Sequence, residues 1–208
     1  MSRSIFHPDS GLMITFGQIT DCIFLSLFWL LGCIPVVTIG ASFAALYDAA
    51  FRGMRRNEKN SWQRFLTVYK ENWKGGIAPT LVFLPLLWLL VRLTVGLWNG
   101  AVFGQISWGV FAAGAFFSVL ALGILSILFP MLSRFENPLA AQLKNTVLIG
   151  FANLPGTIAL GLVNGLTALL CVRYVVPLFF LPALAALVGS LFIEPMFRPY
   201  MPKEEDAA

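Results

Sequence analysis

The feature that most constrains this chain is a series of long apolar runs that hold almost no charge. A transmembrane helix needs about 20 consecutive, mainly apolar residues. Five segments approach or exceed that length, and we expect them to cross a bilayer at residues 16–37, 77–98, 106–132, 155–172 and 175–197. The runs follow one another along residues 1–208 and predict a single all-α membrane domain.

The composition supports this interpretation. Hydrophobic residues make up 58% of the chain and charged residues only 12%, whereas a soluble domain carries about 25% charged residues. Such a chain cannot cover a water-facing surface of this size, and it is too hydrophobic to be disordered. The net charge of +4 does not indicate nucleic-acid binding, because the cations gather between the apolar runs.

The placement of those cations predicts an orientation. With five crossings, eleven of the Lys and Arg residues fall on one side of the membrane and only two, Arg3 and Arg173, fall on the other. Cytoplasmic loops carry the excess of Lys and Arg. We therefore expect the N-terminus outside and the C-terminus in the cytoplasm.

The long cytoplasmic stretch between the first two runs predicts two amphipathic helices, at about residues 42–57 and 61–74. The apolar face of the second is expected to hold Trp62, Phe65, Leu66, Tyr69 and Trp73. Two interpretations stay open. The helices anchor the protein flat at the headgroups, or they form a platform for a partner. The platform residues would be Arg52, Arg55, Arg56, Trp62, Arg64, Lys70 and Trp73.

A third helix of this kind is expected to begin at Asn137 and Pro138, where an N-cap residue precedes a proline. Leu139, Leu143 and Val147 would share its apolar face. The helix could continue into the fourth crossing through a bend at Pro155.

Two charges lie inside predicted crossings, where charge is costly and usually functional. Asp21 and Arg92 are expected at similar depths, roughly 8–9 Å below the outer surface at 1.5 Å per residue. One interpretation is an ion pair between the first two crossings. The other is that each side chain reaches separately toward the interface.

The end of the first run predicts a sharp exit from the membrane. Pro35 weakens helical hydrogen bonding, Thr38 can bond the freed backbone groups, and Gly40 permits a tight turn. We interpret these residues as a membrane-exit elbow. Separately, the spacing of Gly161 and Gly165 is typical of close helix packing.

Nothing in the sequence predicts catalysis. HExxH, GxSxG and phosphate-loop patterns are absent, His7 is the one histidine, and the three cysteines lack CxxC spacing. We expect no enzyme activity, no metal site and no cofactor.

The chain resembles the YesL family of bacterial membrane proteins, a domain of unknown function. The resemblance rests on residues 28–31 (FWLL), 34–40 (IPVVTIG), 44–47 (AALY), Phe65, 70–74 (KENWK), 129–136 (FPMLSRFE) and 143–145 (LKN). It implies a bacterial cell membrane and an association with carbohydrate ABC uptake systems. It carries over no catalytic or ligand-binding residue.

The resulting hypothesis is a non-enzymatic accessory protein linked to carbohydrate ABC-type uptake, with residues 41–74 docking a permease or an ATPase. A small oligomeric transporter or channel is the first alternative. A structural or regulatory membrane protein unrelated to sugars is the second. The bilayer and further copies of the chain are the other partners that these hypotheses allow.

Overall fold

The computed structural model describes residues 11–56, 60–135 and 138–201, and these residues form helices and turns without a strand. The longer helices are α1 (Gly11–Cys33), α2 (Ile39–Asp48), α3 (Ser61–Asn72), α4 (Ile77–Val102), α5 (Trp108–Arg134), α6 (Leu139–Ala152), α7 (Leu154–Arg173) and α8 (Leu181–Phe197). Short segments are the 3-10 turns η1 (Val36–Thr38), η3 (Val176–Phe179) and η4 (Arg198–Tyr200), and the π-helix η2 (Ala49–Arg55).

Four helices of the described chain are long and apolar enough to cross a membrane: α4, α5, α7, and α8 together with η4. They correspond to the last four predicted crossings, so the membrane-helix character expected from hydropathy is confirmed. The first predicted crossing falls on α1 (Gly11–Cys33), and the part of it whose side chains are described, Gly17–Cys33, is a shorter apolar helix. A fifth crossing therefore stays a prediction.

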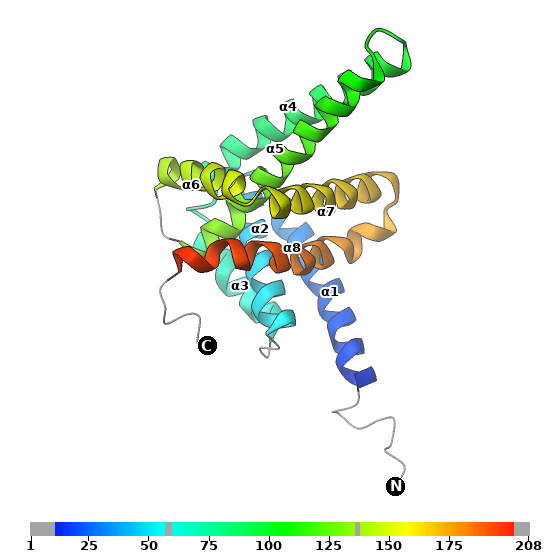
Figure 1. Ribbon diagram of the computed structural model, residues 1–208. Helices are drawn as coiled ribbons and strands as arrows, with labels where there is room; N and C mark the ends of the chain where they lie inside the picture. The colour runs from blue at the N-terminus through cyan, green and yellow to red at the C-terminus, as the bar shows by residue number, and fades with distance from the viewer. Residues whose placement is uncertain (1–10, 57–59, 136–137, 202–208) are drawn as a thin grey trace.

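Helices α1, α2 with η2, and α3 form an antiparallel layer, shown in blue and cyan in Figure 1. At one end of the layer, Gly32 of α1 lies against Ser42 and Tyr69. At the other end, Asp21 accepts a hydrogen bond from Ser61 Oγ at 3.0 Å. Consequently α1 and α3 run in the same direction, and α2 runs against both.

The segment predicted to lie flat at the membrane surface, residues 42–57, is helical as far as Arg55 but does not lie at the surface. Helix α2 and η2 are buried in the interior, where the alanines of α2 and η2 are fully covered. Helices α1, α3, α5 and α8 all contact this segment. Spacing of the large apolar residues identified one buried face, but the opposite face of Ala and Ser is small enough for neighbouring helices to cover it too.

Helices α4 and α5 form a hairpin whose far half extends beyond the rest of the molecule (Figure 1). Helices α6 and α7 lie nearly end to end across α5, and Asn153 interrupts the helical conformation between them. The crossing is very close, because a Cβ atom on Gly123 or Gly161 would lie 2.0 Å from a backbone oxygen of the other helix. Gly161 therefore lies at a close helix contact of the kind that its spacing predicts.

The predicted apolar face of α6 is buried only in part, because Leu139 and Leu143 are half-buried and Val147 is exposed. The fully buried residues of this helix are Gln142, Thr146, Ile149 and Gly150. Gln142 is 2% exposed and Val147 is 46% exposed. Gln142 Nε2 donates to the carbonyl oxygen of Leu128 at 3.1 Å. Since lipid solvates apolar groups well, polar side chains gain by turning toward the protein, and the helix is therefore turned so that Gln142 is covered and Val147 is exposed.

Candidate functional site

The elbow begins where α1 ends at Cys33 and the chain turns through η1 into α2. The Thr38 hydroxyl lies 2.8 Å from the carbonyl oxygens of both Gly32 and Pro35. It can therefore satisfy carbonyl groups that the interrupted helix leaves free. This is the bond that the sequence suggests for Thr38.

Gly40 serves close packing rather than backbone rotation. A Cβ atom there would lie 2.5 Å from Thr80 Oγ1, 2.7 Å from the Gly76 carbonyl oxygen and 2.8 Å from the Phe129 ring. Its amide donates to Thr80 Oγ1 at 2.9 Å, and that hydroxyl donates to Gly76 at 2.6 Å. The elbow is thus tied to the start of α4.

Asp48 lies at the end of α2 and is almost fully buried. Its carboxylate accepts hydrogen bonds from Arg52 Nε at 3.3 Å and from Arg64 Nε, so α2, η2 and α3 meet at one charge. Both arginines were predicted to face a partner. The structure directs them at Asp48, which is 1% exposed.

A second buried charge pair joins distant parts of the chain. Arg134 Nη2 at the end of α5 lies 2.7 Å from Glu194 Oε1 of α8, which also accepts from the Tyr47 hydroxyl at 2.7 Å. Burial raises the pKa of Tyr47 well above its usual range, and the Glu194 carboxylate raises this pKa further. Tyr47 therefore remains a neutral donor.

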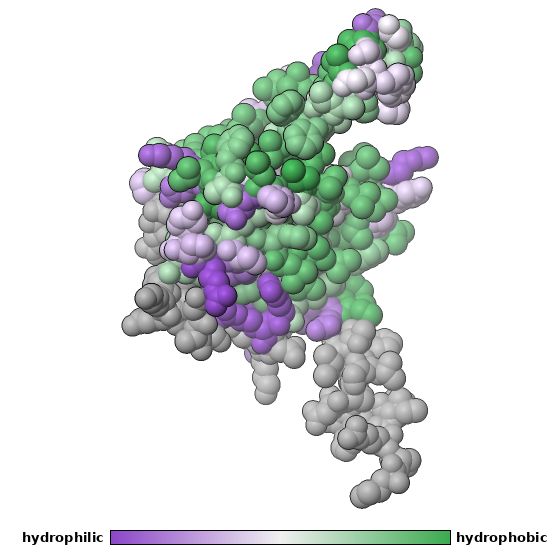
Figure 2. Space-filling model, in the orientation of Figure 1, coloured by the Kyte–Doolittle hydropathy of each residue, from purple (hydrophilic) through white to green (hydrophobic). Residues whose placement is uncertain are grey.

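The Phe51 ring of η2 adjoins this pair and contacts three arginine side chains. The guanidinium groups of Arg55, Arg56 and Arg134 lie 5.6, 4.9 and 4.7 Å from its centroid. Arg55 also donates to the Ser190 carbonyl at 2.9 Å. Arg55 and Arg56 stay exposed. Figure 2 shows that hydrophilic residues gather on the surface near α3 and the end of α8.

The outer face of α3 carries the rest of the predicted platform. Phe65 and Val68 fix the helix to the layer, while Trp62 and Trp73 are 45% and 48% exposed, contrary to the predicted apolar face. Lys70 is exposed on the same helix. We call Trp62, Gln63, Lys70 and Trp73 the outer face of α3.

Asp21 and Arg92 are not brought together. Asp21 bonds Ser61 at the start of α3, whereas Arg92 is exposed on the hairpin and lies 5.8 Å from the Trp88 ring centroid. The predicted pair assumed that α1 and α4 cross side by side. Instead, α1 packs against α2, α3 and α8.

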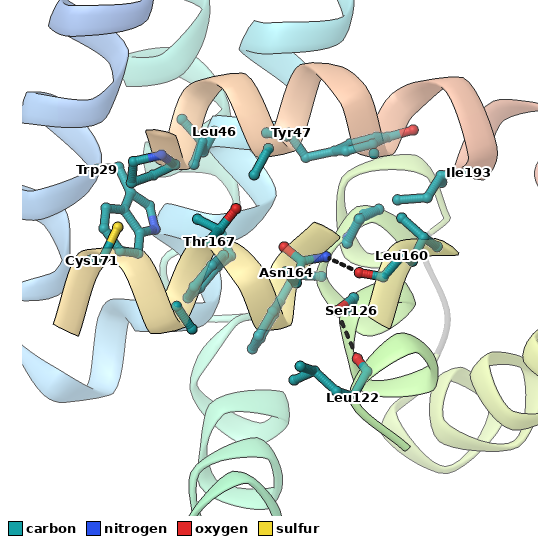
Figure 3. A pocket seen from close by; sticks show the side chains of 18 of the residues that line it. Trp29, Leu46, Tyr47, Leu122, Ser126, Leu160, Asn164, Thr167, Cys171 and Ile193 are labelled. Carbon is teal, nitrogen blue, oxygen red and sulfur yellow. Dashed lines mark hydrogen bonds between the residues drawn. The ribbon is translucent and has the colours of Figure 1, made fainter. Parts of the chain in front are cut away.

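A cavity of about 220 Å³ lies between α2, α5, α7 and α8, with Trp29 of α1 on its wall. Figure 3 shows Trp29 at one end and Asn164 and Thr167 along the α7 wall. The described residues around it are mainly apolar, and none is charged. The sequence gives no sign of this cavity, because its lining comes from helices far apart in the chain.

No three His, Cys, Asp or Glu side chains within the described ranges come close enough to hold a metal ion. The site is thus an elbow, two buried charge pairs, the outer face of α3 and an apolar cavity. The outer face of α3 can bind a protein or membrane surface, and the apolar cavity can bind an apolar molecule.

Comparison with known proteins finds a family model that is similar to one part of the chain. Residues 22–92 match the model of a family described as "Protein of unknown function, DUF624". The match spans the elbow and the outer face of α3, and it is consistent with the YesL resemblance. No curated protein and no solved structure matches the chain.

Proposed function

We propose that this chain is a non-enzymatic accessory protein of the bacterial cytoplasmic membrane that docks a carbohydrate ABC-type transporter through the outer face of α3. The observation that carries the proposal is the exposure of Trp62 and Trp73 on a helix held rigidly by buried Phe65 and Val68. Tryptophan is enriched among the residues that dominate binding at protein interfaces. Carbohydrate uptake as the setting rests on the YesL resemblance.

Charge supports the docking role. Lys70 and Lys74 are exposed, and Lys74 Nζ lies 5.4 Å from the Trp73 ring centroid. Cations with aromatic side chains also suit a lipid headgroup region. A lipid anchor is therefore the competing role that an experiment on this face must separate from docking.

We propose that the layer of α1, α2, η2 and α3, called here the charged layer, faces the cytoplasm. Arg134 and Arg198 lie at the ends of α5 and α8 that adjoin it, and cytoplasmic segments carry the excess of cations. Five crossings with an external N-terminus remain a prediction of the sequence. The contact between Asp21 and Ser61 favours four crossings with both termini cytoplasmic, since it sets the first half of α1 beside the start of α3, on the side that we propose faces the cytoplasm.

An epitope tag after Met1 decides between these arrangements. An impermeant antibody that reaches the tag in intact cells supports five crossings. A tag that is reached only after permeabilisation supports four.

Docking is tested by crosslinking from the outer face of α3. Cys22, Cys33 and Cys171 are first replaced by Ala, and Gln63→Cys is then coupled in cells to a photoreactive maleimide. We expect a one-to-one adduct with a permease or ATPase subunit of a carbohydrate importer. Gln105→Cys at the hairpin tip is the matched control, and it should give no such adduct.

The contrary results identify the alternatives. Adducts with lipid alone indicate an anchor. Unchanged sugar uptake after deletion of the gene indicates a structural or regulatory protein unrelated to sugars. Solute flux through the pure protein in liposomes indicates a transporter in its own right.

A further inference from the structure

Trp29, on the wall of the cavity, carries a hydrogen-bond donor that the protein does not use. Trp29 Nε1 is buried and has no partner among the described residues. Trp29 also lines the cavity. A buried donor without an acceptor costs about 1–3 kcal/mol, so an acceptor that reached Trp29 Nε1 from the cavity would be stabilised there.

The remaining polar atoms on the walls are few and mostly engaged. Asn164 Nδ2 donates to the Leu160 carbonyl at 3.0 Å, and Ser126 Oγ donates to the Leu122 carbonyl at 2.7 Å (Figure 3). A sugar needs many hydrogen-bond partners, and this lining cannot supply them. An ionised group is equally unsuited, since no charged side chain among the described residues faces it.

The cavity lies beside a surface suited to lipid. Leu178 and Pro182 belong to its wall, and the neighbouring Val175, Val176 and Phe179 are exposed apolar side chains. The volume of about 220 Å³ is below the roughly 300–1,000 Å³ of sites for drug-sized ligands. It suits one flexible chain.

We infer that this cavity binds one acyl chain of a membrane glycerolipid, with the ester carbonyl oxygen accepting a hydrogen bond from Trp29 Nε1. The alkyl part occupies the apolar space between α5, α7 and α8. The ligand is neutral at this point, which separates an ester from a free fatty acid. The inference is independent of docking at the outer face of α3.

The probe is a phosphatidylethanolamine with a diazirine near the end of one acyl chain, added to the purified full chain in nanodiscs. After photolysis, we expect labelled peptides from α7 and α8 around Asn164 and Ala186. The ether-linked analogue, which lacks the carbonyl oxygen, should label them about three- to tenfold less, as expected for one lost hydrogen bond. Diazirine palmitic acid should not compete.

Two variants locate the contacts. Trp29→Phe keeps the ring but removes the donor, and it should lower labelling by the ester to the level of the ether. Ala186→Phe fills the cavity and should abolish labelling. The matched controls are Trp88→Phe and Leu184→Phe, whose residues are exposed and do not line the cavity.

Equal labelling by ester and ether in the unaltered chain would overturn the inference, and this arm requires no variant to fold. Labelling confined to the lipid-facing surfaces of α4 and α5 would overturn it as well. Efficient competition by palmitic acid would replace the ester with a fatty acid and contradict the neutral site.

Discussion

The layer of α1, α2, η2 and α3 and the far half of the α4–α5 hairpin differ in what surrounds them. In the layer, small residues such as Ala45 and Ala49 are fully covered and Asp48 is held by arginines. In the hairpin, large apolar residues such as Trp88 and Phe103 are exposed. The hairpin thus depends on lipid as its solvent, whereas the layer depends on shape and charge pairing within the protein.

The largest effect is expected from exchanging two arginines of the α4–α5 hairpin, Arg134 where α5 ends against Phe51 of the layer and Arg92 on the exposed part of α4. The Arg134 side chain is 4% exposed and pairs with Glu194, so Arg134→Met leaves a carboxylate without its partner. We expect a loss of about 3–5 kcal/mol in the free energy of unfolding. Arg92→Met on the hairpin should cost almost nothing. The measurement is unfolding by sodium dodecyl sulfate in mixed micelles, followed by tryptophan fluorescence.

The double variant Arg134→Met with Glu194→Leu sharpens this result. Replacing both partners removes the uncompensated charge, so we expect most of the lost stability to return. Equal losses for Arg134→Met and Arg92→Met would contradict the difference between the two regions.

A smaller effect is expected from adding a side chain to a glycine in each region. Gly40→Val places atoms against Thr80, Gly76 and Phe129, while the space around Gly96 on α4 is open. We expect Gly40→Val to cost about 1–3 kcal/mol and Gly96→Val to leave the unfolding midpoint unchanged. If Gly96→Val were the more harmful change, the hairpin would have a protein neighbour in place of lipid.

The smallest effect is expected from replacing a threonine by valine, which keeps the shape of the side chain and removes its hydroxyl. Thr80→Val leaves the buried Gly40 amide without its acceptor and should cost about 1–2 kcal/mol. Thr94 Oγ1 lies 3.1 Å from Ser118 Oγ in the hairpin, and Thr94→Val should cost about 0.6 kcal/mol. Thermal unfolding in detergent compares the two, and the reverse order would count against this account.

Hydropathy located the four long apolar helices because lipid and protein interior both favour apolar residues. The same equivalence explains the errors. The spacing of apolar residues could not tell that Val147 is exposed while protein covers Gln142. It also could not tell that neighbouring helices bury both faces of α2. The first predicted crossing, which falls on α1, stays a prediction.

The site was predicted unevenly for a related reason. Thr38 bonds carbonyl groups a few residues away, so its local sequence was sufficient. The contact from Tyr47 to Glu194 spans 147 residues, and the contact from Arg134 to Glu194 spans 60. Pairings over such separations depend on how whole helices pack, and a single sequence carries no direct signal for them.

The central claim is that the hairpin tip and the charged layer face opposite compartments. It is tested most directly with an impermeant maleimide on intact cells, using Gln105→Cys or Gln63→Cys in a chain without other cysteines. We predict that Gln105→Cys is labelled from outside, and that Gln63→Cys is labelled only after the membrane is permeabilised. Labelling of both positions in intact cells, or of Gln63→Cys alone, would contradict the account.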